Sequence, residues 1–205
     1  AGAEGERLWA ELHRPEHRDP YGYVIPASQP DFPTAVKFVN ALREVNVAVH
    51  RATAAFEVAG TRYPAGSFVV KTAQAFRPHV LDMFEPQDHP NVFPVPGGPP
   101  TPPYDVAGWT PAFQMGVVFD RILQPLDGPF EAVTEWNVAP AGGSIRPLSV
   151  TTVQAAHLVA RPRQNDAATA INRFFAAGDR VRRLSDGSMA VRLGPGWERG
   201  AFSLR

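Results

Sequence analysis

One order of sequence signals occurs twice in this chain, at about residues 23–71 and again at about 157–205. Each copy opens with a short apolar run typical of a buried strand and continues with the spacing of an amphipathic helix. Turn residues and an alternating strand pattern follow in both copies. Because each helix must bury its apolar stripe against a sheet, the repeat predicts an α/β fold. Its two strand–helix–strand–hairpin units are expected to form one mixed sheet with packed helices.

The helix of the first copy has clear end signals. Asp31 is a good N-cap, and Pro33 falls in the first turn, where its missing N–H costs nothing. Asn46 is expected to end the helix in a left-handed conformation. Apolar residues at helical spacing form the stripe expected to face the sheet, namely Ala35, Val36, Val39 and Leu42.

Strands are expected on either side of this helix, at 23–25 and 47–49. A turn at 59–61 then predicts a hairpin. In this hairpin, residues 56–58 pair with a returning strand that follows a Pro/Gly turn and ends at residue 70.

The second copy repeats these signals. A strand is expected at 157–160, Asp166 is a cap candidate, and Gly178 takes the place of the C-cap asparagine as a residue tolerant of positive φ. The segment 191–202 is matched to 58–68 of the first copy. The helical stripe consists of Ala167, Ala170, Ile171, Phe174 and Phe175. Agreement of cap, turn, aromatic and Gly-x-Phe signals favours duplication over chance similarity of two βα units.

The region between the copies differs from both. It is dense in proline, which excludes regular helix and central strand, and its aromatic residues predict a long ordered loop packed over the domain. A short helix at 80–84 precedes the loop, a strand or a helix end running into one is expected at 115–119, and 125–148 is expected to be loop. The expected domains are an N-terminal helix and linker at 1–20, a first α/β unit at 21–85, the proline-rich aromatic loop with its connecting strand at 86–150, and a truncated second α/β unit at 151–205.

Composition excludes several function classes. The chain has 20 basic and 20 acidic residues, which argues against a nucleic-acid or anionic-membrane partner held by bulk charge. No apolar run approaches the roughly 20 residues that span a bilayer. The chain has no cysteine, so thiol catalysis, disulfides and Cys-ligated zinc are excluded.

A zinc-like spacing occurs near the amino terminus, where His13, Glu16 and His17 match His-x-x-Glu-His. Two histidines four residues apart meet one metal ion only when the backbone between them is helical. Pro15 lies inside that turn and no third ligand follows at a recognisable spacing, so we expect a structural or linker role and no metal site.

A second polar group follows Phe76 in a segment with helical potential. It consists of Arg77, His79, Asp82 and Glu85, and three of these residues lie three positions apart on nearly one face. One interpretation is a solvated face with an Arg–carboxylate pair. The other is a binding surface beside the proline-rich loop, with Tyr104, Asp105 and Trp109 opposite. No serine elbow, phosphate loop or dinucleotide fingerprint occurs, so no catalytic residue is predicted.

The middle of the chain resembles a segment of large exported bacterial proteins of the M14 zinc carboxypeptidase type. The resemblance runs over about residues 19–130, and is weaker over 155–205. The segments that carry it are Asp-Pro-Tyr-Gly-Tyr-Val-Ile-Pro at 19–26, Gln-Pro-Asp-Phe-Pro-Thr-Ala at 29–35, Tyr-Pro-Ala-Gly-Ser-Phe-Val-Val-Lys-Thr-Ala-Gln-Ala-Phe-Arg-Pro at 63–78, Asp-Met-Phe-Glu-Pro-Gln at 82–87 and Pro-Pro-Tyr-Asp-Val-Ala-Gly-Trp-Thr at 102–110.

In those proteins the peptidase domain precedes this kind of segment and holds the zinc ligands. The resemblance therefore implies no zinc ligation by His13 or Glu16, which stand directly before the Asp-Pro linker. It implies an α/β region akin to class I glutamine amidotransferase-like folds, whose thiol chemistry cannot operate without cysteine. It also implies a periplasmic or secreted location and a parent peptidase domain as the partner.

We therefore expect a non-catalytic accessory domain that supports or orients substrate for an exported M14-like zinc metallocarboxypeptidase. This domain would need no cofactor, and zinc would belong to the parent's catalytic domain. The alternative is a peptide- or carbohydrate-binding module that uses the aromatic loop through Tyr104, Trp109 and Phe113. A third hypothesis is a hydrolase with a carboxylate site near Asp82 and Glu85. The second copy stops at Arg205, equivalent to Lys71, so the chain is expected to be incomplete.

Overall fold

The computed structural model describes residues 2–14, 17–86, 92–102, 110–135, 147–148 and 157–192. The chain divides into two compact units, Ala1–Ala139 and Pro140–Arg205. Within the described ranges, no helix combines the length and the apolar character that crossing a membrane requires.

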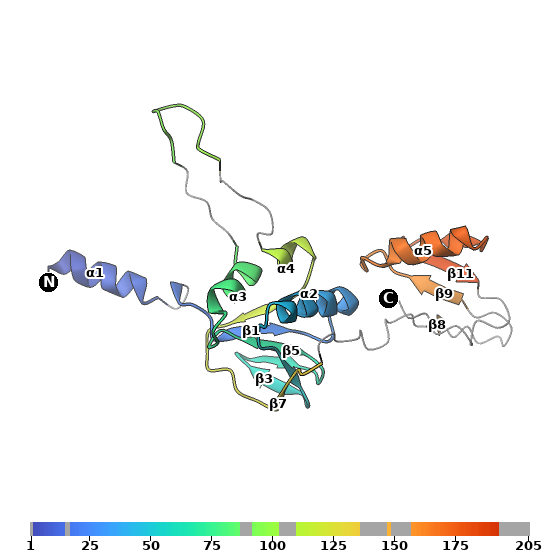
Figure 1. Cartoon of the computed structure of the whole chain (residues 1–205), viewed down its shortest axis with the longest axis horizontal. Helices are drawn as coiled ribbons and strands as arrows, with labels where there is room; N and C mark the ends of the chain where they lie inside the picture. The colour runs from blue at the N-terminus through green and yellow to red at the C-terminus, as the bar shows by residue number, and fades with distance from the viewer. Residues whose placement is uncertain are drawn as a thin grey trace. The chain divides into compact units, whose positions relative to one another are not determined.

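The first unit is built on a five-stranded antiparallel sheet (Figure 1). Its elements are α1 (Ala3–Leu12), β1 (Gly22–Ile25), α2 (Phe32–Glu44), β2 (His50–Ala52), β3 (Phe56–Val58), β4 (Thr61–Tyr63), β5 (Phe68–Lys71), α3 (Arg77–Phe84), α4 (Pro111–Gln114), β6 (Asp120–Ile122) and β7 (Phe130–Ala132). The strand order is β6-β1-β5-β2-β7. Because β5 is antiparallel to both β1 and β2, these two strands run in the same direction, and α2 connects them.

The expected signals of α2 are confirmed. The Asp31 side chain accepts hydrogen bonds from the Thr34 backbone N–H (3.2 Å) and the Thr34 hydroxyl (2.8 Å), which satisfies a helix donor that would otherwise lack a partner. Asn46 has a φ of 64°, the left-handed conformation of a C-cap. All four residues of the predicted stripe are buried: Ala35, Val36, Val39 and Leu42.

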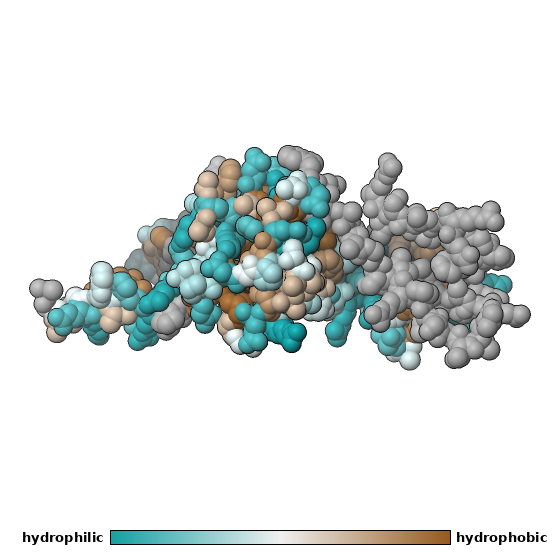
Figure 2. Space-filling view, turned by 90° about the horizontal axis from the view of Figure 1, so that it is seen from below, coloured by the Kyte–Doolittle hydropathy of each residue, from teal (hydrophilic) through white to brown (hydrophobic). Residues whose placement is uncertain are grey.

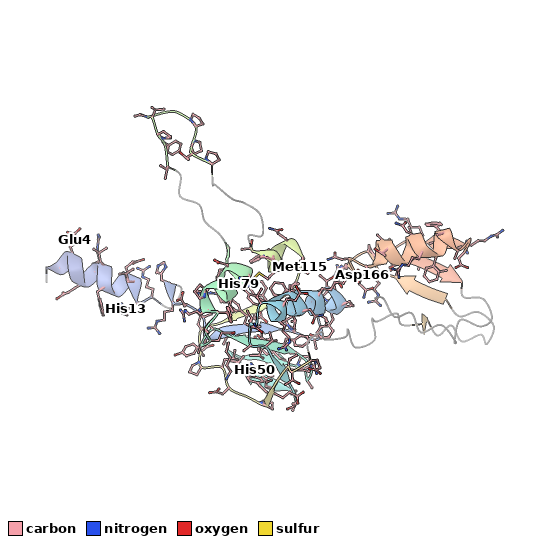
Figure 3. All side chains as sticks on the ribbon, viewed as in Figure 1. Glu4, His13, His50, His79, Met115 and Asp166 are labelled. Carbon is pink, nitrogen blue, oxygen red and sulfur yellow. The ribbon has the colours of Figure 1, made fainter. Side chains whose placement is uncertain are left out.

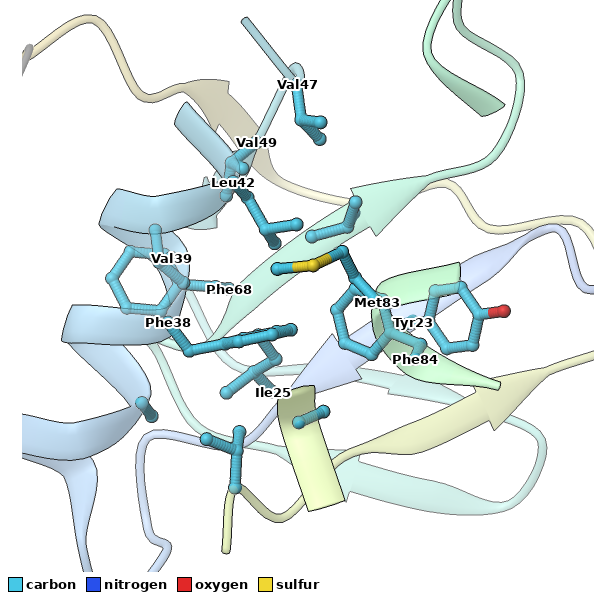
Figure 4. Close-up of a cluster of buried hydrophobic side chains, with 14 of the residues drawn as sticks. Tyr23, Ile25, Phe38, Val39, Leu42, Val47, Val49, Phe68, Met83 and Phe84 are labelled. Atoms are coloured by element: carbon cyan, nitrogen blue, oxygen red, sulfur yellow. The ribbon is translucent and has the colours of Figure 1, made fainter. Parts of the chain in front are cut away.

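Each face of the sheet carries its own core. On one face, α2 and α3 pack around Phe84, whose ring stacks on Tyr23 at 4.1 Å between centroids and meets Phe38 edge-on at 5.0 Å (Figure 4). On the other face, the β3–β4 hairpin places Phe56 and Tyr63 against Val24 and other apolar residues of the sheet. Side chains alternate along a strand, so Tyr23 and Val24 serve opposite cores.

The predicted hairpin is only partly correct. Its turn is confirmed, because Ala59 (φ 53°) and Gly60 (φ 74°) form a two-residue connection with both φ values positive. However, β3 pairs with β4 alone, from Phe56 opposite Tyr63 to Val58 opposite Thr61. The chain then turns again and enters the main sheet as β5, between β1 and β2.

Two strands begin later in the sequence than expected, and a different glutamine side chain explains each shift. Residues 47–49 were expected to be a strand, but β2 begins at His50. The Gln74 carboxamide accepts a hydrogen bond from the Ala48 N–H (2.7 Å) and donates one to the Ala48 carbonyl (3.2 Å). The Gln74 side chain therefore bonds the backbone groups of Ala48 that a neighbouring strand would otherwise bond.

The same arrangement occurs before β6, where 115–119 was expected to be a strand. The Gln29 carboxamide accepts from the Val118 N–H (3.1 Å) and donates to the Val118 carbonyl (3.4 Å). Val24 pairs with Asp120, so Val118 would face Pro26, which has no N–H to donate. The helix end expected in this region is present as α4, and β7 is an edge strand inside a segment that was expected to be loop.

We predict that Gln29→Glu lowers the free energy of unfolding by about 2 kcal/mol, because a carboxylate cannot donate to the Val118 carbonyl. Gln29 is only 8% exposed, so water cannot replace the lost donor. Gln74→Glu is the matched control, since it breaks the same pattern of bonds at a half-buried residue whose bonds to Ala48 are exposed to water, and it should cost less than about 1 kcal/mol. Urea denaturation of both variants measures the difference, and equal losses would contradict the role given to Gln29.

The second unit contains a four-stranded antiparallel sheet with the order β10-β11-β9-β8. Its elements are β8 (Pro147–Leu148), β9 (His157–Ala160), α5 (Ala167–Ala176), β10 (Val181–Arg183) and β11 (Met189–Arg192). The strand at 157–160 and the helix after Asp166 are confirmed. Gly178 has a φ of 81°, as expected of the C-cap equivalent of Asn46. Helix α5 buries Ile171 and Phe174.

Both units place a later strand between two parallel strands joined by a helix. In the first unit β5 lies between β1 and β2, and in the second β11 lies between β9 and β10. Strands β1 and β9 begin at residues 22 and 157, and helices α2 and α5 begin at 32 and 167, an offset of 135 in both cases. Gln29, Asp31, Thr34 and Ala35 recur at this offset as Gln164, Asp166, Thr169 and Ala170.

The expectation of one mixed sheet is wrong for the described strands. They form separate sheets in which every pairing is antiparallel, because the strand that follows each βα unit inserts between its two parallel strands. In the second unit, β11 (Met189–Arg192) takes the position that β5 has in the first unit. It lies earlier in the chain than the segment that was matched to β5 from the sequence. Residues 193–205 lie outside the described part.

Candidate functional site

Charged side chains meet where α3 approaches β1 and β6. Glu85, which directly follows α3, accepts hydrogen bonds at Oε1 from the Tyr23 hydroxyl (2.6 Å) and from Arg121 Nε (2.7 Å). At the start of the helix, Arg77 forms an ion pair with Asp19. We call these five residues the charged cluster. Arg121 also donates to the Arg18 carbonyl, so the cluster ties the segment before β1 to the sheet as well.

Burial makes these contacts matter for stability. The side chains of Glu85 and Arg121 are 27% and 30% exposed, and Tyr23 is fully buried. Burial raises the pKa of the Tyr23 hydroxyl far above its usual value, and its hydrogen bond to the Glu85 carboxylate raises the pKa further. The phenol therefore stays a donor at physiological pH, and the cluster holds α3 on the sheet.

Two of the four predicted residues of α3 and its C-cap have their partners in the charged cluster. Arg77 and Glu85 belong to the charged cluster, at opposite ends of the helix. His79 is half-buried, whereas Asp82 is exposed. The three residues expected opposite them, Tyr104, Asp105 and Trp109, lie outside the described residues.

Sequence reasoning missed Tyr23, Arg121 and Asp19. Glu85 is 62 residues from Tyr23 and 36 from Arg121, so no local spacing joins them. Tyr23 was placed in a buried strand, and a buried tyrosine needs a partner for its hydroxyl, which is the one signal that could have predicted a polar neighbour. A similar pair lies on the other face of the sheet, where the Tyr63 hydroxyl donates to Asp120 Oδ2 (2.8 Å).

The zinc-like spacing near the amino terminus forms no metal centre in the described part of the chain. Helix α1 ends at Leu12, and His13 stacks on Trp9 with its Nδ1 2.7 Å from the Trp9 carbonyl oxygen. His17 Nε2 lies 3.4 Å from Glu11 Oε1, and Glu16 is outside the described residues. Among those described, no three histidine, aspartate or glutamate side chains converge as metal ligands would.

Exposed apolar side chains gather in two places. Along α1, Leu8, Trp9 and Leu12 are each more than half exposed, and apolar side chains lie among polar ones there (Figure 2). The described part of the proline-rich loop, 92–102, contains no charged residue. Its ends are joined by a hydrogen bond from the Thr101 N–H to the Val92 carbonyl (2.8 Å). We call residues 92–102 the proline-rich arm.

The proline-rich arm is not packed over the domain as expected. Val92, Phe93 and Val95 are 54%, 54% and 58% exposed. The Gly98 N–H donates to the Val95 carbonyl (3.1 Å) and closes a turn at the tip of the arm. Exposed apolar side chains that gather in one place are typical of binding surfaces.

His50 lies on β2, and its surroundings predict a pH dependence of stability (Figure 3). Burial lowers its pKa, and the nearby Lys71 charge lowers it further, while a contact with the Val69 backbone opposes this shift in part. The Nδ1 atom is buried, and it has no hydrogen-bond partner in the described part of the chain. In the unfolded chain the pKa is about 6.5. Between the two values the unfolded state binds more protons, so stability falls as the pH drops below about 6.5.

We predict that the urea midpoint of the wild-type chain decreases between pH 7.5 and pH 5.5, and that His50→Phe weakens this decrease by removing the titrating group. His13→Gln, at an exposed position, is the control and should keep the wild-type pH dependence. An unchanged slope in the His50 variant would contradict the role of this histidine.

Comparison of the chain with protein-family models, with curated proteins and with solved structures finds no match.

Proposed function

We propose that this chain is a non-catalytic accessory region of an exported M14-like zinc carboxypeptidase, where it supports or orients the substrate. Zinc would be held by the parent's peptidase domain, and the protein would be periplasmic or secreted. The proposal is supported by the resemblance over about residues 19–130. Several residues in its motifs have structural roles here, since Asp31 caps α2 and Gln29 and Gln74 bond backbone groups.

Two of the predicted polar residues already have partners within the fold, and this observation carries the non-catalytic part of the proposal. Glu85 Oε1 already accepts two hydrogen bonds, and Arg77 is engaged by Asp19. A general base must reach the proton that it removes from a substrate. The Glu85 oxygen is instead directed at Tyr23 and Arg121, which disfavours a carboxylate hydrolase at this place.

The alternative function, a module that binds peptide or glycan, is favoured by the proline-rich arm. Phe93 and its neighbours Val92 and Val95 offer apolar contacts, and the arm has no charge that must be desolvated. Both functions are compatible, because an accessory region can act by binding the substrate of its parent.

A peptidase assay tests the proposal. The 205-residue chain, loaded with excess Zn²⁺, is expected to release no C-terminal residue from a panel of short peptides. The complete reading frame from the same gene is expected to release it. Hydrolysis by the 205-residue chain alone, or a reading frame without a peptidase domain, would overturn the proposal.

We also propose that the two units arose by duplication. The shared strand order, the common offset of 135 and the recurrence of glutamine, aspartate, threonine and alanine support this origin. Chance similarity of two βα units does not require the same four residues at the same positions before and within the helix.

A further inference from the structure

The zero net charge of the chain conceals a strong difference between its two units. Residues 140–205 contain ten basic residues and four acidic ones, a net charge of +6. The first unit contains ten basic and sixteen acidic residues, a net charge of −6. Every basic residue of the second unit is an arginine, the side chain whose planar guanidinium matches carboxylates and phosphates.

Three of these arginines lie on or directly before β10. Arg180, Arg182 and Arg183 are exposed, and within the described residues no hydrogen bond or ion pair engages their side chains. Asp179 precedes them, and Asp166 and Asp186 are the other acidic residues between 157 and 192, where seven arginines occur. The surface around β10 therefore keeps a positive charge.

The position of β10 in the sheet adds a second, independent property. It is the end strand in the order β10-β11-β9-β8, and its pairing with β11 uses one side of its backbone. No described strand pairs with the other side. In many proteins, arginines on an edge strand have no role except to prevent pairing with another strand. The positive charge disfavours the approach of basic and apolar strands, whereas it attracts a strand rich in carboxylates.

We propose that β10 is the docking strand for an extended acidic polypeptide, which adds to the sheet beside Val181–Arg183. Backbone groups of the peptide would pair with the side of β10 on which no described strand lies. Because side chains alternate along a strand, carboxylates on one face of the peptide would accept hydrogen bonds from Arg180 and Arg182, and carboxylates on the other face from Arg183. A polypeptide fits better than a nucleic acid, because only a polypeptide repeats donors and acceptors at the spacing of a strand. This site belongs to the second unit and does not depend on the accessory function.

The test uses the 205-residue chain and a fluorescein-labelled peptide of about twelve residues that alternates glutamate with threonine, a length that spans β10 with room to spare. Fluorescence anisotropy at low salt gives the dissociation constant. The triple variant R180Q/R182Q/R183Q is expected to bind about ten-fold more weakly. The triple variant R7Q/R18Q/R62Q loses the same charge from exposed sites of the first unit and should stay within about two-fold of wild type.

A second probe separates strand addition from simple charge attraction. The same peptide, N-methylated on every residue, keeps its carboxylates but has no backbone N–H to donate to β10, so its binding should weaken about ten-fold. Equal losses in both triple variants, undiminished binding of the methylated peptide, or equally tight binding of single-stranded DNA of the same charge would each overturn the proposal. If the first triple variant does not fold, Arg182→Gln alone should weaken binding about two- to three-fold, and no weakening would overturn it.

Discussion

Replacing Phe84 by alanine is expected to lower the free energy of unfolding by about 4 kcal/mol. Its ring is fully buried and contacts three other rings, those of Tyr23, Phe38 and Phe119, at centroid distances of 4.1, 5.0 and 5.0 Å. The cavity would open between α2, α3 and the sheet, where the rigid strands cannot close it. Urea denaturation followed by tryptophan fluorescence and circular dichroism measures the loss.

Phe113→Ala provides the matched control for this prediction. Phe113 is 56% exposed, and its ring lies 5.3 Å from that of Phe119, a member of the same aromatic group. We expect a loss below about 1 kcal/mol. A loss at Phe84 no larger than that at Phe113 would show that α3 does not complete the core.

Glu85→Ala is expected to lower the free energy of unfolding by about 2–3 kcal/mol. The substitution leaves the Tyr23 hydroxyl without its acceptor inside the core and Arg121 without its carboxylate. The cost of breaking a fully buried pair is higher, about 3–5 kcal/mol, but here both charged side chains retain some contact with water.

Glu44→Ala removes the same side chain from an exposed position at the end of α2 and should change stability by less than about 0.5 kcal/mol. Combining Glu85→Ala with Arg121→Ala and Tyr23→Phe should cost less than the sum of the single variants, since the three groups share one set of bonds. Strict additivity would mean that the charged cluster does not act as a unit.

Local signals predicted the elements well. Asp31, the stripe from Ala35 to Leu42 and Asn46 all act within one helix, and short-range physics determines their roles. The strands at 23–25 and 157–160 are also confirmed, because a short apolar run bounded by turn residues has few other uses.

Strand ends and strand partners were predicted less well, for a physical reason. Gln29 and Gln74 bond backbone groups at Val118 and Ala48, so the hydrophobic pattern continues past the point where strand pairing stops. The insertion of β5 between β1 and β2 depends on which strand edges are free in three dimensions, and no local pattern records that.

In the candidate site, too, local signals predicted some residues and not their distant partners. Periodicity placed Arg77 and Glu85 around one helix, and both do carry polar contacts. Their partners Asp19, Tyr23 and Arg121 are distant in sequence, so the structural use of the cluster could not be predicted from spacing. The contributions of Tyr104, Asp105 and Trp109 to binding stay predictions.

The central proposal is that this chain binds substrate for a catalytic domain of the same protein, and steady-state kinetics of the complete protein tests it most directly. In that protein, Phe93→Ser with Val95→Ser removes apolar contacts that the proline-rich arm would make with substrate. We expect KM for a peptide substrate to rise about ten-fold with kcat unchanged, as for a residue that binds the ground state and the transition state alike. A fall in kcat with KM unchanged would contradict the account.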